Sequence, residues 1–106
     1  MTPRRRFDET ALGEALPGVE ILAPQGALHP DRLIQAFVGA WAGEAAVLEK
    51  VSVSRHLPAK PGAPLWLRGT VYGRHLDGSR RLSIRVVGED DLGDRLSGVV
   101  RVQLTA

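Results

Sequence analysis

The sequence predicts an α+β domain in which a curved antiparallel sheet wraps around one central helix. Three observations indicate this fold class: one segment has apolar residues at helical spacing, several segments alternate apolar and polar residues, and turn residues separate the alternating segments. A length of 106 residues predicts a single domain over 1–106. Residues 1–6, which include three consecutive arginines, are expected to form a flexible arm.

The predicted helix begins within HPDRLIQAFVGAWAGE, residues 29–44. Pro30 suits the first helical position because its missing N–H would have no helical partner there. Asp31 follows in the first turn, where a negative charge complements the helix dipole. Gly43 is a plausible end. The apolar residues at helical spacing are Leu33, Ile34, Phe37, Val38 and Trp41. Because this stripe is wide, we expect the helix to be mostly buried.

Period-two alternation predicts four strands after the helix and a shorter strand before it, so that the sheet has one buried and one wetter face. The four later strands are expected at 47–55, 64–74, 81–88 and 98–105, and the short first strand at 19–22. In the strand at 47–55 the parity places Val47, Val51 and Val53 together on one face.

Turn residues set the expected connections between these strands. Pro17-Gly18 predicts a turn before the first strand, and Asp77-Gly78 predicts a hairpin between the second and third strands after the helix. The acidic segment 88–94 is interpreted as a longer turn that joins the last two strands. One apolar helix and one apolar sheet face then pack most simply in the hot-dog arrangement, with the helix enclosed by the curved sheet.

Residues 28–105 resemble the MaoC-like branch of hot-dog proteins, and in particular its small actinobacterial-type subunits. The segments that carry the resemblance are LIQAFVGAWAG followed by VLEKVSVSR, then LPAKPGAPLWLRGTV, and finally LSIRVVGEDDLGDRLSGVVRVQL. The resemblance implies an enoyl-CoA hydratase or dehydratase, a lyase of lipid metabolism that takes a CoA thioester and needs no other cofactor. It also implies pairing with a second hot-dog subunit, as a homodimer or a heteromer, and an acyl pocket where two subunits meet.

The catalytic pair of that family cannot be carried over to this sequence. The family's chemistry needs an aspartate and a histidine about five residues apart, before the central helix, to orient water and move protons. Here only APQGALHP separates the first strand from the helix, and the nearest carboxylate before His29 is Glu20, nine residues upstream. We therefore favour a degenerate or partner subunit that contributes to an acyl-binding tunnel, and whether the chain is itself an enzyme stays open.

If the chain is an active hydratase or thioesterase, His29 and Asp31 are the candidate catalytic residues, together with N–H groups at the helix start. Helix capping and a favourable first-turn charge explain the same two residues without catalysis. The residues expected to bind substrate are Leu33, Phe37, Trp41, Arg55 and His56. The three histidines lack zinc-motif spacing, so no metal site is predicted.

A third interpretation is a non-enzymatic nucleic-acid-binding β-barrel. The face of the sheet opposite the core is expected to carry Trp66, Arg68, Tyr72, Arg85 and Arg101, and such arginines and aromatics can hold phosphates and stack on bases. However, a net charge of +2 is too small to indicate nucleic acid by itself. We therefore favour a solvent-exposed face or a subunit contact. The absence of cysteine fits the reducing cytoplasm, and no apolar segment approaches membrane-spanning length.

Overall fold

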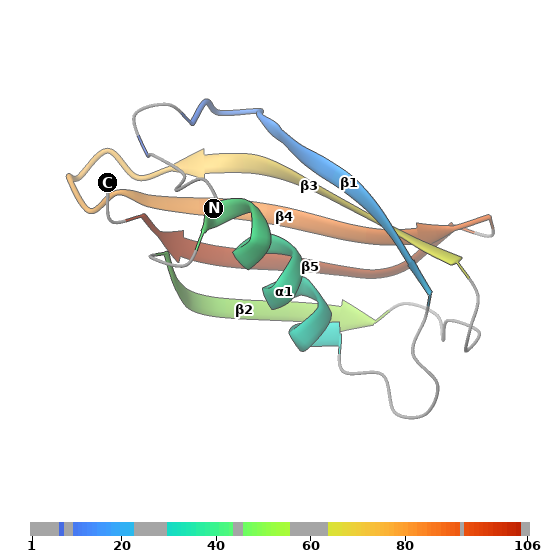
Figure 1. Ribbon diagram of the computed structural model, residues 1–106. Helices are drawn as coiled ribbons and strands as arrows, with labels where there is room; N and C mark the ends of the chain where they lie inside the picture. Colours follow the sequence, from blue (N-terminus) through green and yellow to red (C-terminus); the bar gives the residue numbers. More distant parts are fainter. Residues whose placement is uncertain are drawn as a thin grey trace.

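A computed structural model of the protein describes residues 7, 10–22, 30–43, 46–55, 64–91 and 93–104. Its elements are β1 (Ala15–Leu22), α1 (Pro30–Ala42), β2 (Val47–Arg55), β3 (Pro64–Arg74), β4 (Arg81–Asp90) and β5 (Gly93–Gln103). The strands form one antiparallel sheet in the order β1-β3-β4-β5-β2, and α1 lies across one face of it (Figure 1). The predicted α+β architecture is confirmed, whereas the predicted arm, 1–6, lies outside the described residues.

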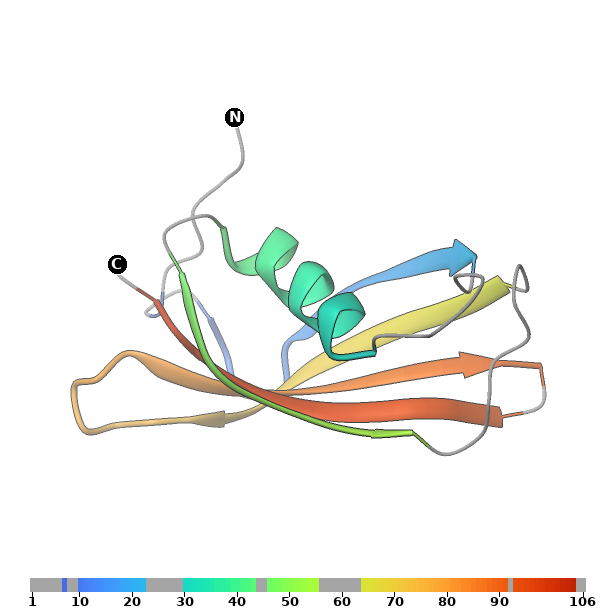
Figure 2. The same cartoon turned by 90° about the horizontal axis from the view of Figure 1, so that it is seen from below.

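The sheet is curved and the helix lies on its hollow side (Figure 2). Ile34 and Val38 are fully buried against the sheet. The helix ends where predicted, because Gly43 adopts a φ of 94° and donates its N–H to the carbonyl oxygen of Gly39 at 2.9 Å. The expectation of a mostly buried helix is wrong, since the sheet covers only one side. Its exposed side chains are Asp31, Arg32, Gln35, Ala36 and Ala40.

The hydrophobic core fills the space between α1 and the inner face of β3, β4 and β5. The fully buried strand residues there are Leu65, Val71, Leu82, Ile84, Val86, Leu96, Val100 and Val102. The side chain of Ile34 in α1 lies against Gly98 of β5, where a Cβ atom would lie 2.7 Å from Cδ1 of Ile34. It would also lie 3.0 Å from the carbonyl oxygen of Ser52 in β2. A glycine at this position therefore lets helix and sheet approach each other.

The first strand is longer than predicted. It begins at Ala15, and Pro17 and Gly18 lie within it rather than in a turn before it. The register against β3 shifts between Leu16 and Val19, which identifies an irregularity at the Pro-Gly pair. Proline is compatible with this strand because β1 is at the edge of the sheet and one side of its backbone has no strand partner.

The strand β2 also contains a register shift, between Leu48 and Lys50, and the shift changes which residues face the core. Val47 was expected on the same face as Val51 and Val53, but its side chain is 51% exposed. Leu48 packs against the core in its place, together with Val51 and Val53. The simple alternation of the sequence therefore fails for the first residues of this strand.

The two hairpins of the sheet differ in how well the sequence predicts them. The hairpin between β3 and β4 is confirmed at Asp77-Gly78, where the N–H of Ser79 donates to Oδ1 of Asp77 at 3.0 Å. The longer turn expected at 88–94 is wrong. β4 continues to Asp90, which pairs directly with Gly93, the first residue of β5, so the acidic residues Glu89, Asp90 and Asp94 belong to the strands.

Candidate functional site

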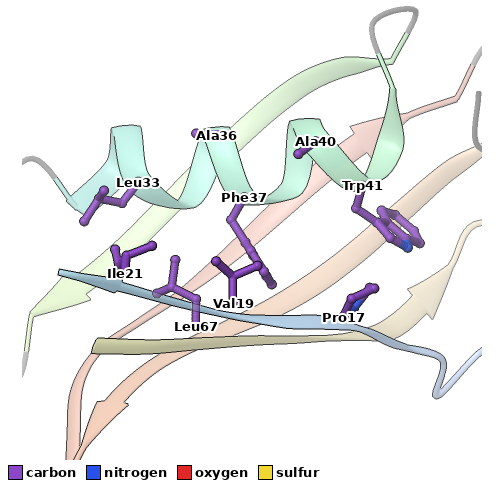
Figure 3. A pocket seen from close by; sticks show the side chains of 9 residues that line it. All are labelled: Pro17, Val19, Ile21, Leu33, Ala36, Phe37, Ala40, Trp41 and Leu67. Carbon is purple, nitrogen blue, oxygen red and sulfur yellow. The ribbon is translucent and has the colours of Figure 1, made fainter. Parts of the chain in front are cut away.

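An apolar groove of about 400 Å³ opens between α1 and the strands β1 and β3 (Figure 3). It exists because α1 packs mainly over β2 and β5, at the opposite edge of the sheet from β1. The residues that line this α1–β1 groove are Pro17, Val19 and Ile21 of β1, Leu67 of β3, and Leu33, Ala36, Phe37, Ala40 and Trp41 of α1.

Phe37 occupies the middle of the groove and is only 9% exposed (Figure 3). Its ring rests above Gly69 of β3, since a Cβ atom at this glycine would lie 3.1 Å from Cε2 of Phe37. Trp41 and Pro17 lie at one end of the groove, and Leu33 lies at the other (Figure 3). Trp41 and Leu33 thus close the two ends of the groove, and the ring of Phe37 forms its base.

The chemistry of this lining is almost entirely apolar. None of the nine residues carries a titratable side chain, and the indole nitrogen of Trp41 is the single side-chain nitrogen or oxygen among them. Covering such a surface with an apolar ligand is favourable by about 25 cal/mol per Å² removed from water. Proton transfer, by contrast, requires a side chain that gains or loses a proton. The described part of the lining can therefore hold an apolar chain but cannot supply an acid or a base.

In the described part of the chain, the ion pairs lie outside the groove lining. Nε of Arg81 is 2.6 Å from Oε1 of Glu49, and this hydrogen bond lowers the pKa of the Glu49 carboxyl. Nε of Arg95 is 2.6 Å from Oδ2 of Asp90, in a pair that is mostly buried. Within the described ranges, no three His, Asp or Glu side chains lie close enough together to hold a metal ion. No helix in those ranges has the length and apolar content needed to cross a membrane.

No family model matches the sequence, and no curated protein matches it. Solved structures do match the fold. A chain of the ChsH1-ChsH2 complex from Mycobacterium tuberculosis superposes with a TM-score of 0.80 at 18% identity, over 91% of this chain and 99% of that one. The (R)-hydratase from A. caviae involved in PHA biosynthesis gives a TM-score of 0.76 at 13% identity, over 91% and 98% of the two chains.

The chain has the hot-dog fold. A third hot-dog structure, the fluoroacetyl-CoA thioesterase FlK, matches with a TM-score of 0.65 at 15% identity, over 91% of this chain and 88% of that one. The hot-dog arrangement expected from the sequence is confirmed.

The structure of this hot-dog chain brings together three of the seven predicted site residues. Leu33, Phe37 and Trp41 all line the α1–β1 groove. Asp31 is exposed in the first turn of the helix and is not part of the lining. His29, His56 and the side chain of Arg55 lie outside the described residues, so their roles stay predictions.

Sequence reasoning missed the strand side of the groove and the two small helix residues. Pro17, Val19 and Ile21 follow each other at a spacing of two, which is the signal that they share one face of β1. Nothing in the sequence showed that this face of β1 would lie opposite Ala36 and Ala40, on the other side of an open groove. That relation depends on where the helix crosses the sheet.

Proposed function

We propose that this chain is a MaoC-like hot-dog subunit of acyl-CoA metabolism, which holds the acyl chain of a CoA thioester and contributes little chemistry of its own. The observation that carries the proposal is that none of the nine described residues that line the groove has a titratable side chain. Among the structures that share the fold are hydratases and a fluoroacetyl-CoA thioesterase, which supports a CoA thioester as the ligand. Such a role, with no cysteine in the chain, fits the cytoplasm.

The position of Glu20 supports the loss of the catalytic pair. This carboxylate is the nearest one upstream of His29, and it lies between Val19 and Ile21 in β1. Because side chains alternate along a strand, Glu20 points to the opposite face from these two groove residues. It lines a separate hollow with Trp66 and Glu89. A carboxylate on that side of the sheet cannot orient a base beside the groove.

We propose further that the edge of β2 joins a second hot-dog subunit, either another copy or a catalytically complete partner. Among the described strands, β1 and β2 are the two edges of the sheet. The β1 edge contains Pro17 and an irregular register, both of which interfere with strand addition. The β2 edge contains no proline, and from Lys50 to Arg55 it pairs regularly with β5. Regular backbone on an open edge is suited to continuing the sheet into a neighbour.

Acyl binding is tested by filling the groove from the helix. Ala36→Trp places a large ring in the groove, and we expect it to lower the affinity for octanoyl-CoA, measured by calorimetry, to the affinity for free CoA. Gln35→Trp is the matched control, since Gln35 is the neighbouring exposed helix residue and does not line the groove. Equal affinities of the two variants and the parent chain would remove the groove as the acyl site.

The partner role is tested by activity and by mass. The isolated chain is expected to hydrate crotonyl-CoA far below the 1–10³ s⁻¹ of ordinary enzymes. The protein purified from its native cell is expected to carry a second thioester-handling chain or a second copy of itself, as seen by native mass spectrometry. Ordinary turnover by the isolated chain would contradict the degenerate role and support the active-enzyme alternative, and loss of that turnover in His29→Ala would then locate the site.

A further inference from the structure

The outer face of the sheet, which points away from α1, carries a second hollow. This outer-face hollow has a volume of about 410 Å³ and lies over β1, β3 and β4. Its polar lining comes from the side chains of Trp66, Arg68, Thr70 and Arg85. Thr70 and Arg85 face each other in the β3–β4 register. An indole, two guanidinium groups and a hydroxyl therefore converge in one concave site that the proposed acyl-binding role does not use.

The indole of Trp66 is held in position by the backbone of β1. A Cβ atom at Gly18 would lie 3.2 Å from Cζ2 and Nε1 of Trp66 and 3.3 Å from Cε2. Gly18 has no positive φ, so it is required here for space and not for backbone conformation. The indole thus rests on the strand, while 41% of the Trp66 surface stays exposed. A supported ring with an open face is a platform on which a planar ligand can stack.

The cations of the hollow differ in how far they are neutralised. Nε of Arg68 lies 3.0 Å from Oε1 of Glu89. Arg85 is exposed, and no carboxylate in the described part of the chain forms an ion pair with it. In the register of β4 and β5, Arg85 is a diagonal neighbour of Arg101, which lies opposite Lys50 of β2. Positive charge therefore continues from the hollow across the outer face.

We propose that the outer-face hollow binds a nucleoside phosphate. The base stacks on the exposed face of Trp66, and the phosphate is held by Arg85 with Arg68 and the hydroxyl of Thr70 beside it. Further phosphates would extend toward Arg101. The same chemistry is offered by a free nucleotide and by one nucleotide unit of a single strand, and the experiment below separates these sources.

This site is independent of the α1–β1 groove. Trp66 and Arg85 line the outer hollow and are not part of the groove lining. The chain contains two tryptophans, Trp41 in the groove and Trp66 in the hollow, so each site has its own indole N–H signal in a ¹⁵N-resolved NMR spectrum. Trp66→Phe assigns the two signals. Octanoyl-pantetheine, which lacks the nucleotide, tests the groove through Trp41 while ADP tests the hollow through Trp66.

Titration with ADP is expected to shift the Trp66 signal with saturation below about 1 mM and to leave the Trp41 signal in place. Inorganic pyrophosphate, which has no base, should bind more weakly, and Trp66→Leu should lower the ADP affinity about fivefold or more. The proposal would be overturned if the Trp66 signal did not saturate with ADP, or if pyrophosphate shifted this signal equally and bound with equal affinity. Either result is independent of the effect of octanoyl-pantetheine on the Trp41 signal.

The contribution of Arg85 is tested against a matched arginine. Arg85→Gln is expected to lower the ADP affinity about tenfold, because it removes a charge-assisted hydrogen bond. Arg32→Gln removes the same charge from an exposed position on α1 and should leave the affinity unchanged. Equal losses in both variants would overturn the site. A single-stranded oligonucleotide that binds more tightly than ADP identifies a strand as the source, whereas equal or weaker binding identifies the free nucleotide.

Discussion

Gly98→Ala is predicted to destabilise the fold by about 1–2 kcal/mol, even though alanine is ordinarily preferred to glycine in a strand by about 0.5–1 kcal/mol. The added Cβ atom would lie 2.7 Å from Cδ1 of Ile34, about 0.8 Å closer than the shortest favourable separation of two carbon atoms, about 3.5 Å. Ile34 is fully buried, so a new rotamer displaces its neighbours. The carbonyl oxygen of Ser52, at 3.0 Å, belongs to the β2 backbone and cannot move without disturbing the pairing with β5.

The assay is urea unfolding at one fixed protomer concentration, combined in a double-mutant cycle with Ile34→Val. Ile34→Val removes Cδ1 and should lower the free energy of unfolding by about 1 kcal/mol in the parent chain. In the Gly98→Ala background it should lower this free energy much less, because the loss of Cδ1 relieves the clash with the added Cβ atom. Gly39→Ala is the control: a Cβ atom there meets nothing within 4 Å, and we expect about 1 kcal/mol of stabilisation. A Gly98→Ala protein as stable as the parent, or strictly additive effects with Ile34→Val, would refute the close approach.

Three further predictions concern side chains. Asp90→Ala should cost about 3 kcal/mol in urea unfolding, because it leaves the mostly buried guanidinium of Arg95 without this carboxylate; Arg95→Met should cost less. The hydrogen bond from Arg81 lowers the pKa of the Glu49 carboxyl. The stabilisation that this hydrogen bond gives the fold is therefore complete above the ordinary glutamate pKa of about 4.3, and it is lost as the pH falls through the lowered pKa. Glu49→Gln should therefore differ from the parent in unfolding at pH 7, and this difference should shrink as the pH falls. Phe37→Ala should cost about 3 kcal/mol and weaken acyl binding in calorimetry.

Local patterns in the sequence were sufficient for the helix and most of the sheet. The stripe through Ile34, Phe37 and Val38 has helical spacing, and these are the residues that the structure buries against the sheet. Alternation in 64–74 predicted Trp66 on the outer face, and the structure exposes it between the buried residues Leu65 and Leu67. These features depend on neighbouring residues alone, so a single sequence contains the information needed to predict them.

The missed features depend on contacts between distant segments. Pro17-Gly18 has the composition of a turn, but pairing with β3 extends β1 through it. The register shift in β2 exchanges Val47 for Leu48 on the core face, and no local signal marks it. The α1–β1 groove likewise follows from the placement of α1 toward β2 and β5. The sequence therefore identified the helix side of the candidate site and not its opposite wall.

The central claim, that the α1–β1 groove holds an acyl chain, is tested most directly by chain length. Acetyl-, butyryl-, hexanoyl- and octanoyl-CoA are titrated calorimetrically into the protein, as isolated chain or in its native assembly. Each added CH₂ that enters the groove should strengthen binding by up to about 0.8 kcal/mol, until the space of about 400 Å³ is filled. Affinities that do not change with chain length, and that equal the affinity for free CoA, would contradict the claim.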